Sequence, residues 1–123
     1  MTAQAAVQSG NATTAGAENR GWFTGLFLPA GAGLRRAPVE LKWSAVAAGW
    51  VRGWSDPAEQ TSLALLVSDG ALRFEFDDGS AAVLQTPGDY VLWAPGLRHN
   101  VYADAASTLV TVRWAADEQG VPQ

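Results

Sequence analysis

The sequence contains no cysteine and a single histidine, and both shortages limit the chemistry open to it. Without cysteine, the chain can form no disulfide and has no thiol nucleophile. One histidine, His99, is a poor basis for a metal centre, because zinc, iron and manganese sites need about three or four donor atoms converging on one point. We therefore expect neither a bound metal nor another cofactor.

Charged side chains are also scarce and unequal in number. Eight Lys and Arg against twelve Asp and Glu give a net charge of −4. This balance argues against the basic surface that nucleic-acid phosphates require and against binding to anionic membranes. No apolar run approaches the ~20 residues of a membrane span, and the first residues lack the pattern of a secretory signal. A cytoplasmic protein without nucleic-acid or membrane partners is expected.

The composition divides the chain into a polar start, a globular centre and a short polar end. Residues 1–20 are mostly small or polar and contain no aromatic side chain. They cannot bury enough apolar surface to offset the entropy of ordering, so we predict a flexible tail. Aromatic and aliphatic residues begin just after Gly21, and residues 21–114 are enough for one domain with its own core. Residues 115–123 are interpreted as a second tail.

Short segments of alternating or apolar character, separated by turn residues, predict an all-β domain. In 39–46, apolar residues alternate with polar ones that include Glu40 and Lys42, the pattern of a half-buried strand whose polar face is solvated. Asp78-Gly79 is a strong hairpin signal. Turn signals recur every ~8–12 residues, as in a β-sandwich or barrel. The other predicted strands are 48–54, 61–67, 72–76, 82–85, 90–93, 100–103 and 108–114.

Two Pro-Gly turns and the histidine lie close together in T-P-G-D-Y-V-L-W-A-P-G-L-R-H-N, residues 86–100. Proline presets such a turn and glycine permits a positive φ, while 90–93 between the turns is a predicted strand. A glycine, a short hydrophobic strand, Pro-Gly, two residues and a histidine resemble the second motif of the cupin superfamily. Pro95-Gly96 and His99 stand in the matching positions.

The resemblance covers residues 21–114 and implies a cupin-type double-stranded β-helix, a jelly-roll barrel, as a single domain. The segment S-L-A-L-L-V-S-D-G-A-L-R-F-E-F, residues 62–76, looks like the end of the first cupin motif. That motif normally supplies two histidines and a glutamate to a metal, but 46–63 contains no histidine here. A metal-dependent dioxygenase, which is typical of cupins, is disfavoured because these ligands are missing.

The resemblance also implies a ligand pocket between the two sheets, on the strand that His99 opens. Without metal ligands we expect this pocket to be apolar. His99 is the candidate catalytic residue, because an imidazole exchanges protons near neutral pH. Six tryptophans suit a flat hydrophobic or aromatic ligand, although the same rings can simply fill the core. The predicted substrate-binding residues are Trp43, Trp50, Trp54, Trp93 and Arg113, the last because a charge within an apolar strand needs a partner.

Two kinds of function stay open. One is a metal-independent cyclase, isomerase or lyase in which His99 moves a proton, with Asp56 and Glu59 on the loop near the barrel mouth as alternative carboxylate bases. The other is a carrier or sensor that binds a small molecule without turnover. A His99→Ala enzyme would lose turnover and keep affinity, whereas a binder would at most lose affinity. For either function a homodimer is expected, because cupins commonly pair through sheet edges.

Overall fold

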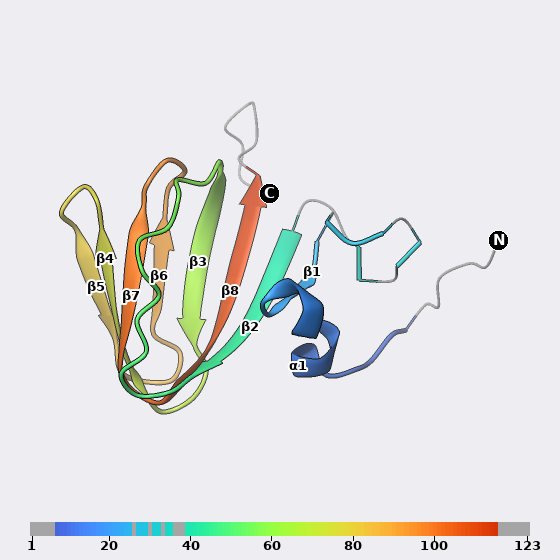
Figure 1. The fold of residues 1–123 in the computed structure, drawn as a ribbon, viewed down its shortest axis with the longest axis horizontal. Helices are drawn as coiled ribbons and strands as arrows, with labels where there is room; N and C mark the ends of the chain where they lie inside the picture. The colour runs from blue at the N-terminus through green and yellow to red at the C-terminus, as the bar shows by residue number, and fades with distance from the viewer. Residues whose placement is uncertain (1–6, 26, 30, 33, 36–38, 116–123) are drawn as a thin grey trace.

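The computed structural model describes residues 7–25, 27–29, 31–32, 34–35 and 39–115. Its secondary structure is almost entirely β, as the sequence predicts (Figure 1). Two short helices precede the strands, α1 (Ala12–Ala15) and the 3₁₀ helix η1 (Ala17–Asn19). No helix among the described residues has the length and apolar character needed to cross a membrane. The strands are β1 (Trp22–Thr24), β2 (Val39–Val46), β3 (Gln60–Leu66), β4 (Ala71–Phe76), β5 (Ala81–Leu84), β6 (Tyr90–Trp93), β7 (His99–Ala105) and β8 (Ser107–Ala115).

The strands form two antiparallel sheets that face one another as in a jelly-roll barrel (Figure 1). The larger sheet has the order β1-β2-β8-β3-β6 and the smaller one β5-β4-β7. Residues 49–55 run along the free edge of β7. There the main-chain N–H of Gly49 donates to Ala103 (2.7 Å) and that of Ser55 donates to His99 (2.8 Å). This segment therefore extends the smaller sheet beside His99.

Most strand boundaries agree with the sequence prediction to within one or two residues, and β2 and β6 agree at both ends. The predicted strand at 48–54 is the exception, because it forms only the isolated bridge between Val51 and Tyr102. Gly49 and Gly53 adopt positive φ angles of 89° and 82° there. Such angles interrupt a regular ladder, so this segment follows β7 without becoming a strand.

The predicted turns form through local side-chain chemistry. Asp78 Oδ1 accepts the main-chain N–H of Ser80 (2.9 Å) in the hairpin between β4 and β5. Asp89 caps the next turn, where its carboxylate accepts the N–H groups of Gln85 and Thr86, both at 2.9 Å. These bonds lower the pKa of Asp89. Aspartates and glycines thus fix these turns from the sequence alone.

The hydrophobic core lies between the sheets, and β4 supplies its centre. Phe74 is 1% exposed, while Arg73 beside it points to solvent and pairs with Asp104 at 2.7 Å. This is the alternation that the sequence predicts for β4. The core consists of aliphatic and aromatic residues from both sheets: Ala64, Leu66, Leu72, Phe74, Phe76, Leu84, Trp93, Val101, Ala103 and Leu109.

In β2, by contrast, the polar face is directed inward. Lys42 pairs in register with Thr111 of β8, and Glu40 pairs with Arg113. Lys42 and Thr111 line an internal cavity, so the predicted solvation of Glu40 and Lys42 is wrong. Strand alternation shows which residues share a face but not which face is turned inward. Val39, Leu41, Trp43 and Ala45 of β2 therefore lie on the outer face of the larger sheet, while Val46 packs against the core.

The described part of the predicted N-terminal tail contains the two helices. Asn11 caps α1 by accepting the N–H groups of Thr13 and Thr14. The carbonyl of Gly21 accepts the N–H of Trp43 at 2.9 Å, which attaches the end of this segment to β2. The flexibility of 1–20 and the boundary at residue 21 stay predictions. Residues 1–6, and 116–123 of the predicted C-terminal tail, lie outside the described residues.

Phe74→Ala should destabilise the fold strongly, because the ring is 1% exposed and lies 5.7 Å from the Trp93 ring centroid. We expect the free energy of unfolding to fall by about 3–5 kcal/mol. Val83→Ala on the neighbouring strand is the control, since Val83 is 55% exposed, and it should change the value by no more than about 0.5 kcal/mol. Urea denaturation measures both. Equal effects would contradict the placement of the core.

Candidate functional site

A cavity of about 380 Å³ lies between the two sheets. This volume is in the range of small-molecule sites, about 300–1,000 Å³. Both sheets contribute to its wall, as do the segment beside β7 and the N-terminal segment. The lining residues are Arg20, Trp22, Lys42, Ser44, Trp50, Arg52, Ser55, Asp56, Pro57, Ala58, Ser62, Trp93, Leu97, His99, Val101, Leu109, Thr111 and Arg113.

The cavity is rich in positive charge. Of the eight Lys and Arg in the sequence, four line it: Arg20, Lys42, Arg52 and Arg113. Among the described residues, Asp56 is the one carboxylate in the lining, and Glu40 contacts Arg113 from the adjacent hollow. Even with both carboxylates ionised, two positive charges are left over. The apolar pocket expected from the sequence is therefore wrong, because the inward faces of β2 and β8 are polar.

His99 lies at the start of β7, where it is closely joined to Ser55. The main-chain N–H of His99 donates to Ser55 Oγ at 3.0 Å, and the same hydroxyl lies 3.0 Å from Nδ1 of the imidazole. Ser55 is itself only 7% exposed. These contacts fix the position of the imidazole. They form because the pairing of 49–55 with β7 places Ser55 next to His99.

Aromatic rings surround the imidazole on its apolar side. Its ring centroid lies 4.7 Å from that of Trp93 and 6.4 Å from those of Phe74 and Phe76. Burial, followed by the positive charges of Arg52 and Lys42, lowers the pKa of His99 to about 4. At neutral pH the imidazole is consequently uncharged. It can accept a proton, but it holds none to donate as an imidazolium.

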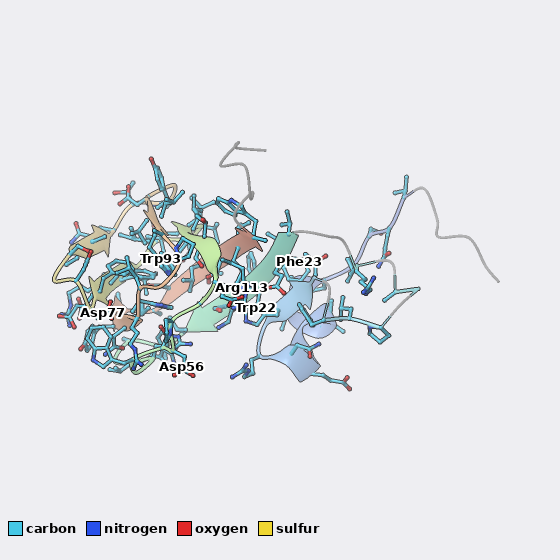
Figure 2. The ribbon with its side chains drawn as sticks, turned by 90° about the horizontal axis from the view of Figure 1, so that it is seen from above. Trp22, Phe23, Asp56, Asp77, Trp93 and Arg113 are labelled. Carbon is cyan, nitrogen blue, oxygen red and sulfur yellow. The ribbon has the colours of Figure 1, made fainter. Side chains whose placement is uncertain are left out.

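Arg113 has the partner that its place in an apolar strand requires. Its Nε donates to Glu40 Oε1 across the β2–β8 pair. The guanidinium carbon also lies 3.9 Å from the centroid of the Trp22 ring, and Lys42 Nζ lies 5.7 Å from it. Figure 2 shows Trp22 and Arg113 side by side, near the larger sheet. The partner that the charge of Arg113 needs is therefore a carboxylate of the protein itself.

The structure brings together three of the five predicted substrate-binding residues. Trp93, Trp50 and Arg113 line the cavity with His99. Trp43 and Trp54 do not. Trp43 lies on the outer face of β2, opposite Lys42, and Trp54 is 52% exposed beside the inward Ser55. Successive side chains of an extended segment point to opposite sides. This explains why Trp43 and Trp54 point away from the cavity while their neighbours Lys42 and Ser55 line it.

The sequence analysis missed much of the charged wall. Arg20 and Trp22 come from the segment around the predicted tail boundary, and Arg52 comes from the region where the first cupin motif would place its histidines. Lys42 was assigned to solvent. One sequence feature could have predicted this charged wall. Segments 39–46 and 107–115 each have a polar face, and two such faces side by side indicate a polar cavity. Of the two alternative bases, Asp56 lines the cavity, and Glu59 is not among its lining residues.

The residues present do not fit the metal that the resemblance to cupins implies. Among the described residues, no group of three or more His, Asp or Glu is placed to hold a metal ion. His99 and Asp56 are the nitrogen and carboxylate donors of the cavity wall, and four cations share that wall. A metal ion needs more donors and would be repelled by these cations.

Comparison with known proteins gives matches in structure alone. No protein family and no curated protein matches the sequence. A cupin superfamily protein from Desulfitobacterium hafniense has a TM-score of 0.57 at 15% identity, over 68% of this chain and 74% of its own. A cupin-2 domain protein from Shewanella frigidimarina has a TM-score of 0.53 at 18% identity, over 63% and 72%. A structure of the DMSP lyases RdDddP and RnDddQII reaches 0.63 at 16% identity, over 83% and 50%.

These matches include an enzyme and proteins without a stated activity, and at such low identity they show the fold and not the chemistry. They agree with the resemblance drawn from Pro95-Gly96 and His99. The chain is therefore a small protein with the cupin fold.

Proposed function

We propose that this chain binds a small organic anion inside its barrel. The observation that carries the proposal is the convergence of Arg20, Lys42, Arg52 and Arg113 on one cavity in a chain of net charge −4. Gathering like charges in a partly desolvated space costs free energy. A bound carboxylate or phosphate would offset this cost, since such groups form strong charge-assisted hydrogen bonds with arginine.

A planar or aromatic group on the ligand suits the rest of the wall. Trp22, Trp50 and Trp93 line the cavity, and aromatic rings offer a large contact area to flat molecules. Hydroxyl groups lie among them and can direct polar substituents. The proposed ligand is thus aromatic, as expected from the sequence, and in addition carries a negative charge. The hydroxyl-bearing residues of the lining are Ser44, Ser55, Ser62 and Thr111.

Binding without turnover, as in a carrier or sensor, needs nothing beyond these contacts. A second candidate is a metal-independent proton transfer within a cyclase, isomerase or lyase reaction. The uncharged imidazole of His99 favours it, because this is the form of a general base. In this reading His99 takes a proton from the bound anion, and Arg52 stabilises the negative charge that develops.

Binding should depend on ligand charge. We expect benzoate to bind more tightly than benzyl alcohol, which has the same ring without the carboxylate. Arg52→Gln should weaken benzoate binding by about tenfold or more, the effect of losing one hydrogen bond to a charged group. Isothermal titration calorimetry measures these affinities, and binding should weaken as salt is added.

Arg73→Gln is the matched control, because Arg73 lies on the outer side of the smaller sheet and pairs with Asp104. It should leave benzoate affinity unchanged. Equal affinity for benzyl alcohol and benzoate would refute the anion proposal and leave the neutral aromatic ligand as the better explanation. His99→Ala then separates the two candidates: a binder would at most lose affinity, whereas an enzyme keeps affinity and loses turnover.

The pKa of His99 gives an independent readout of the cavity charge. Because His99 is the only histidine, its ring protons can be followed by NMR without ambiguity. We expect titration near pH 4 and a higher pKa in Arg52→Gln, since Arg52 is among the causes that lower it. A bound anion should raise the pKa for the same reason. The folded state should lose stability as pH falls from 6.5 towards 4, because the unfolded chain takes up a proton there that the native chain excludes.

Arg98→Gln is the control for this titration, since Arg98 is exposed and lies outside the cavity lining. A normal pKa in the wild type would contradict the burial of His99 beside these cations. An unchanged pKa in Arg52→Gln would show that the charge of Arg52 does not reach the imidazole.

We also propose that the chain pairs as a homodimer through the outer face of its larger sheet. The outward residues of the neighbouring strands β2, β8, β3 and β6 include no charged side chain. Tyr90 and Leu92 are 63% and 53% exposed. By register, the outward residues are Val39, Leu41, Trp43 and Ala45 of β2, Thr108, Val110, Val112 and Trp114 of β8, Thr61, Leu63 and Leu65 of β3, and Tyr90 and Leu92 of β6.

The size and character of this outer face suit a second copy of the chain. Together, β2, β8, β3 and β6 cover about 500 Å² in projection. Because side chains protrude from the sheet, the accessible area approaches the ~800 Å² per partner of a stable interface. An uncharged apolar face is complementary to itself under two-fold symmetry. Pairing by this face replaces the edge-to-edge pairing expected from the sequence.

Leu92→Glu should dissociate the dimer, because it places a charge in an apolar interface. Val83→Glu is the matched control, since Val83 is 55% exposed on β5 of the smaller sheet against 53% for Leu92. Native mass spectrometry and sedimentation give the subunit count. A monomeric wild type, or equal dissociation by both variants, would refute the proposed interface.

A further inference from the structure

Lys42 is the only lysine in the sequence, and it points into the cavity from the middle of β2. Its register partners are Trp22 of β1 and Thr111 of β8. Among the described residues its amine forms no ion pair and no hydrogen bond, and the Trp22 ring 5.7 Å away is its one aromatic contact. The nearest glutamate on the same face, Glu40, is held by Arg113.

The surroundings of Lys42 favour its uncharged amine. Burial lowers its pKa most, and repulsion by Arg52, Arg20 and Arg113 lowers it further. Arginine does not lose its proton near neutral pH, so lysine is the group that can relieve the crowding by deprotonation. An unprotonated lysine beside other cations is an activated nucleophile for carbonyl carbon.

The three arginines and the lysine have complementary chemistry. Arg20, Arg52 and Arg113 stay charged and can hold a carboxylate, as in the proposed function on which this inference rests. Lys42 lines the same cavity, which is small enough to keep a carbonyl group next to a bound carboxylate within reach of its amine. Anion binding alone would be served equally well by a fourth arginine.

We infer that Lys42 forms an imine with an oxo-carboxylate, an organic anion that carries a ketone or aldehyde carbonyl near its carboxylate. The nitrogen lone pair attacks the carbonyl carbon, and the carbonyl oxygen takes up a proton to give a carbinolamine. Loss of water then forms the C=N bond. The oxygen leaves with the two hydrogens that the amine carried, so the step needs no oxidant or reductant. Among organic anions, the site therefore selects those with a reactive carbonyl.

Pyruvate and sodium borohydride test this inference directly, because borohydride reduces an imine to a stable secondary amine. The chain offers two kinds of amine, Lys42 and the terminal amino group, and peptide mapping tells them apart. We expect one reduced adduct on Lys42 in the wild type. The adduct should be lost from this position in Lys42→Arg, which keeps the positive charge, and diminished in Arg52→Gln. Arg73→Gln, outside the cavity, should retain it.

Two probes separate this inference from the proposed function. Lactate has a hydroxyl group in place of the pyruvate carbonyl, so it can bind the arginines but cannot form an imine. Lactate binding together with an adduct confined to the terminal amino group would overturn the inference and leave anion binding intact. Failure of both lactate and benzoate to bind would count against the proposed function itself. Acetone has the carbonyl without the carboxylate, and labelling of Lys42 by acetone as efficient as by pyruvate would overturn the oxo-carboxylate specificity.

Mapping of the wild type alone decides which amine reacts, so the test does not depend on the folding of any variant. The pH dependence adds a second readout. Trapping at Lys42 should persist to lower pH than trapping of an ordinary lysine peptide, because the environment lowers its pKa. Identical pH profiles for the two would contradict an activated amine.

Discussion

Crowding of positive charge inside the barrel is the constraint on which the site depends. Four cations share one cavity wall, and a single ion pair, between Arg113 and Glu40, relieves part of their repulsion. The positive charge of the arginines also acts on Lys42 and His99, which can lose a proton. It adds to burial in lowering the pKa of Lys42 and of His99. The site is therefore a set of fixed guanidinium charges beside an uncharged imidazole and a lysine whose pKa is lowered.

The outer face of the larger sheet follows from the same pattern. Because successive side chains of a strand point to opposite sides, the inward Lys42 and Ser44 of β2 require outward apolar neighbours. The same holds in β8, where Thr111 and Arg113 point inward and Val112 points outward. A polar interior and an apolar exterior are thus one feature of the larger sheet, seen from its two sides. The proposed ligand site and the proposed dimer interface therefore lie on opposite faces of this sheet.

The departure from the usual cupin motif also has a physical counterpart in the structure. In cupins, the first motif supplies histidines to a metal, and in this chain the corresponding segment supplies Arg52, Ser55 and Asp56 to the cavity wall. Arg52 thus adds positive charge to the cavity wall at a place where cupins have metal ligands. Ser55 holds the imidazole of His99 in place through two contacts at 3.0 Å.

The sequence by itself determined most of the strands, their turns and the cupin resemblance. Alternation placed β2, and a short run of β-branched and aromatic residues between two Pro-Gly turns placed β6. Asp78 and Asp89 fixed the turns in which they lie, because these signals act between residues close in the chain. Only the tertiary structure decided which face of each strand is inside, and hence that Lys42 lines the cavity while Trp43 does not. It also brought Arg20 and Arg113 to one wall from opposite ends of the chain. Such placements depend on pairing between distant strands, which no local pattern of residues encodes.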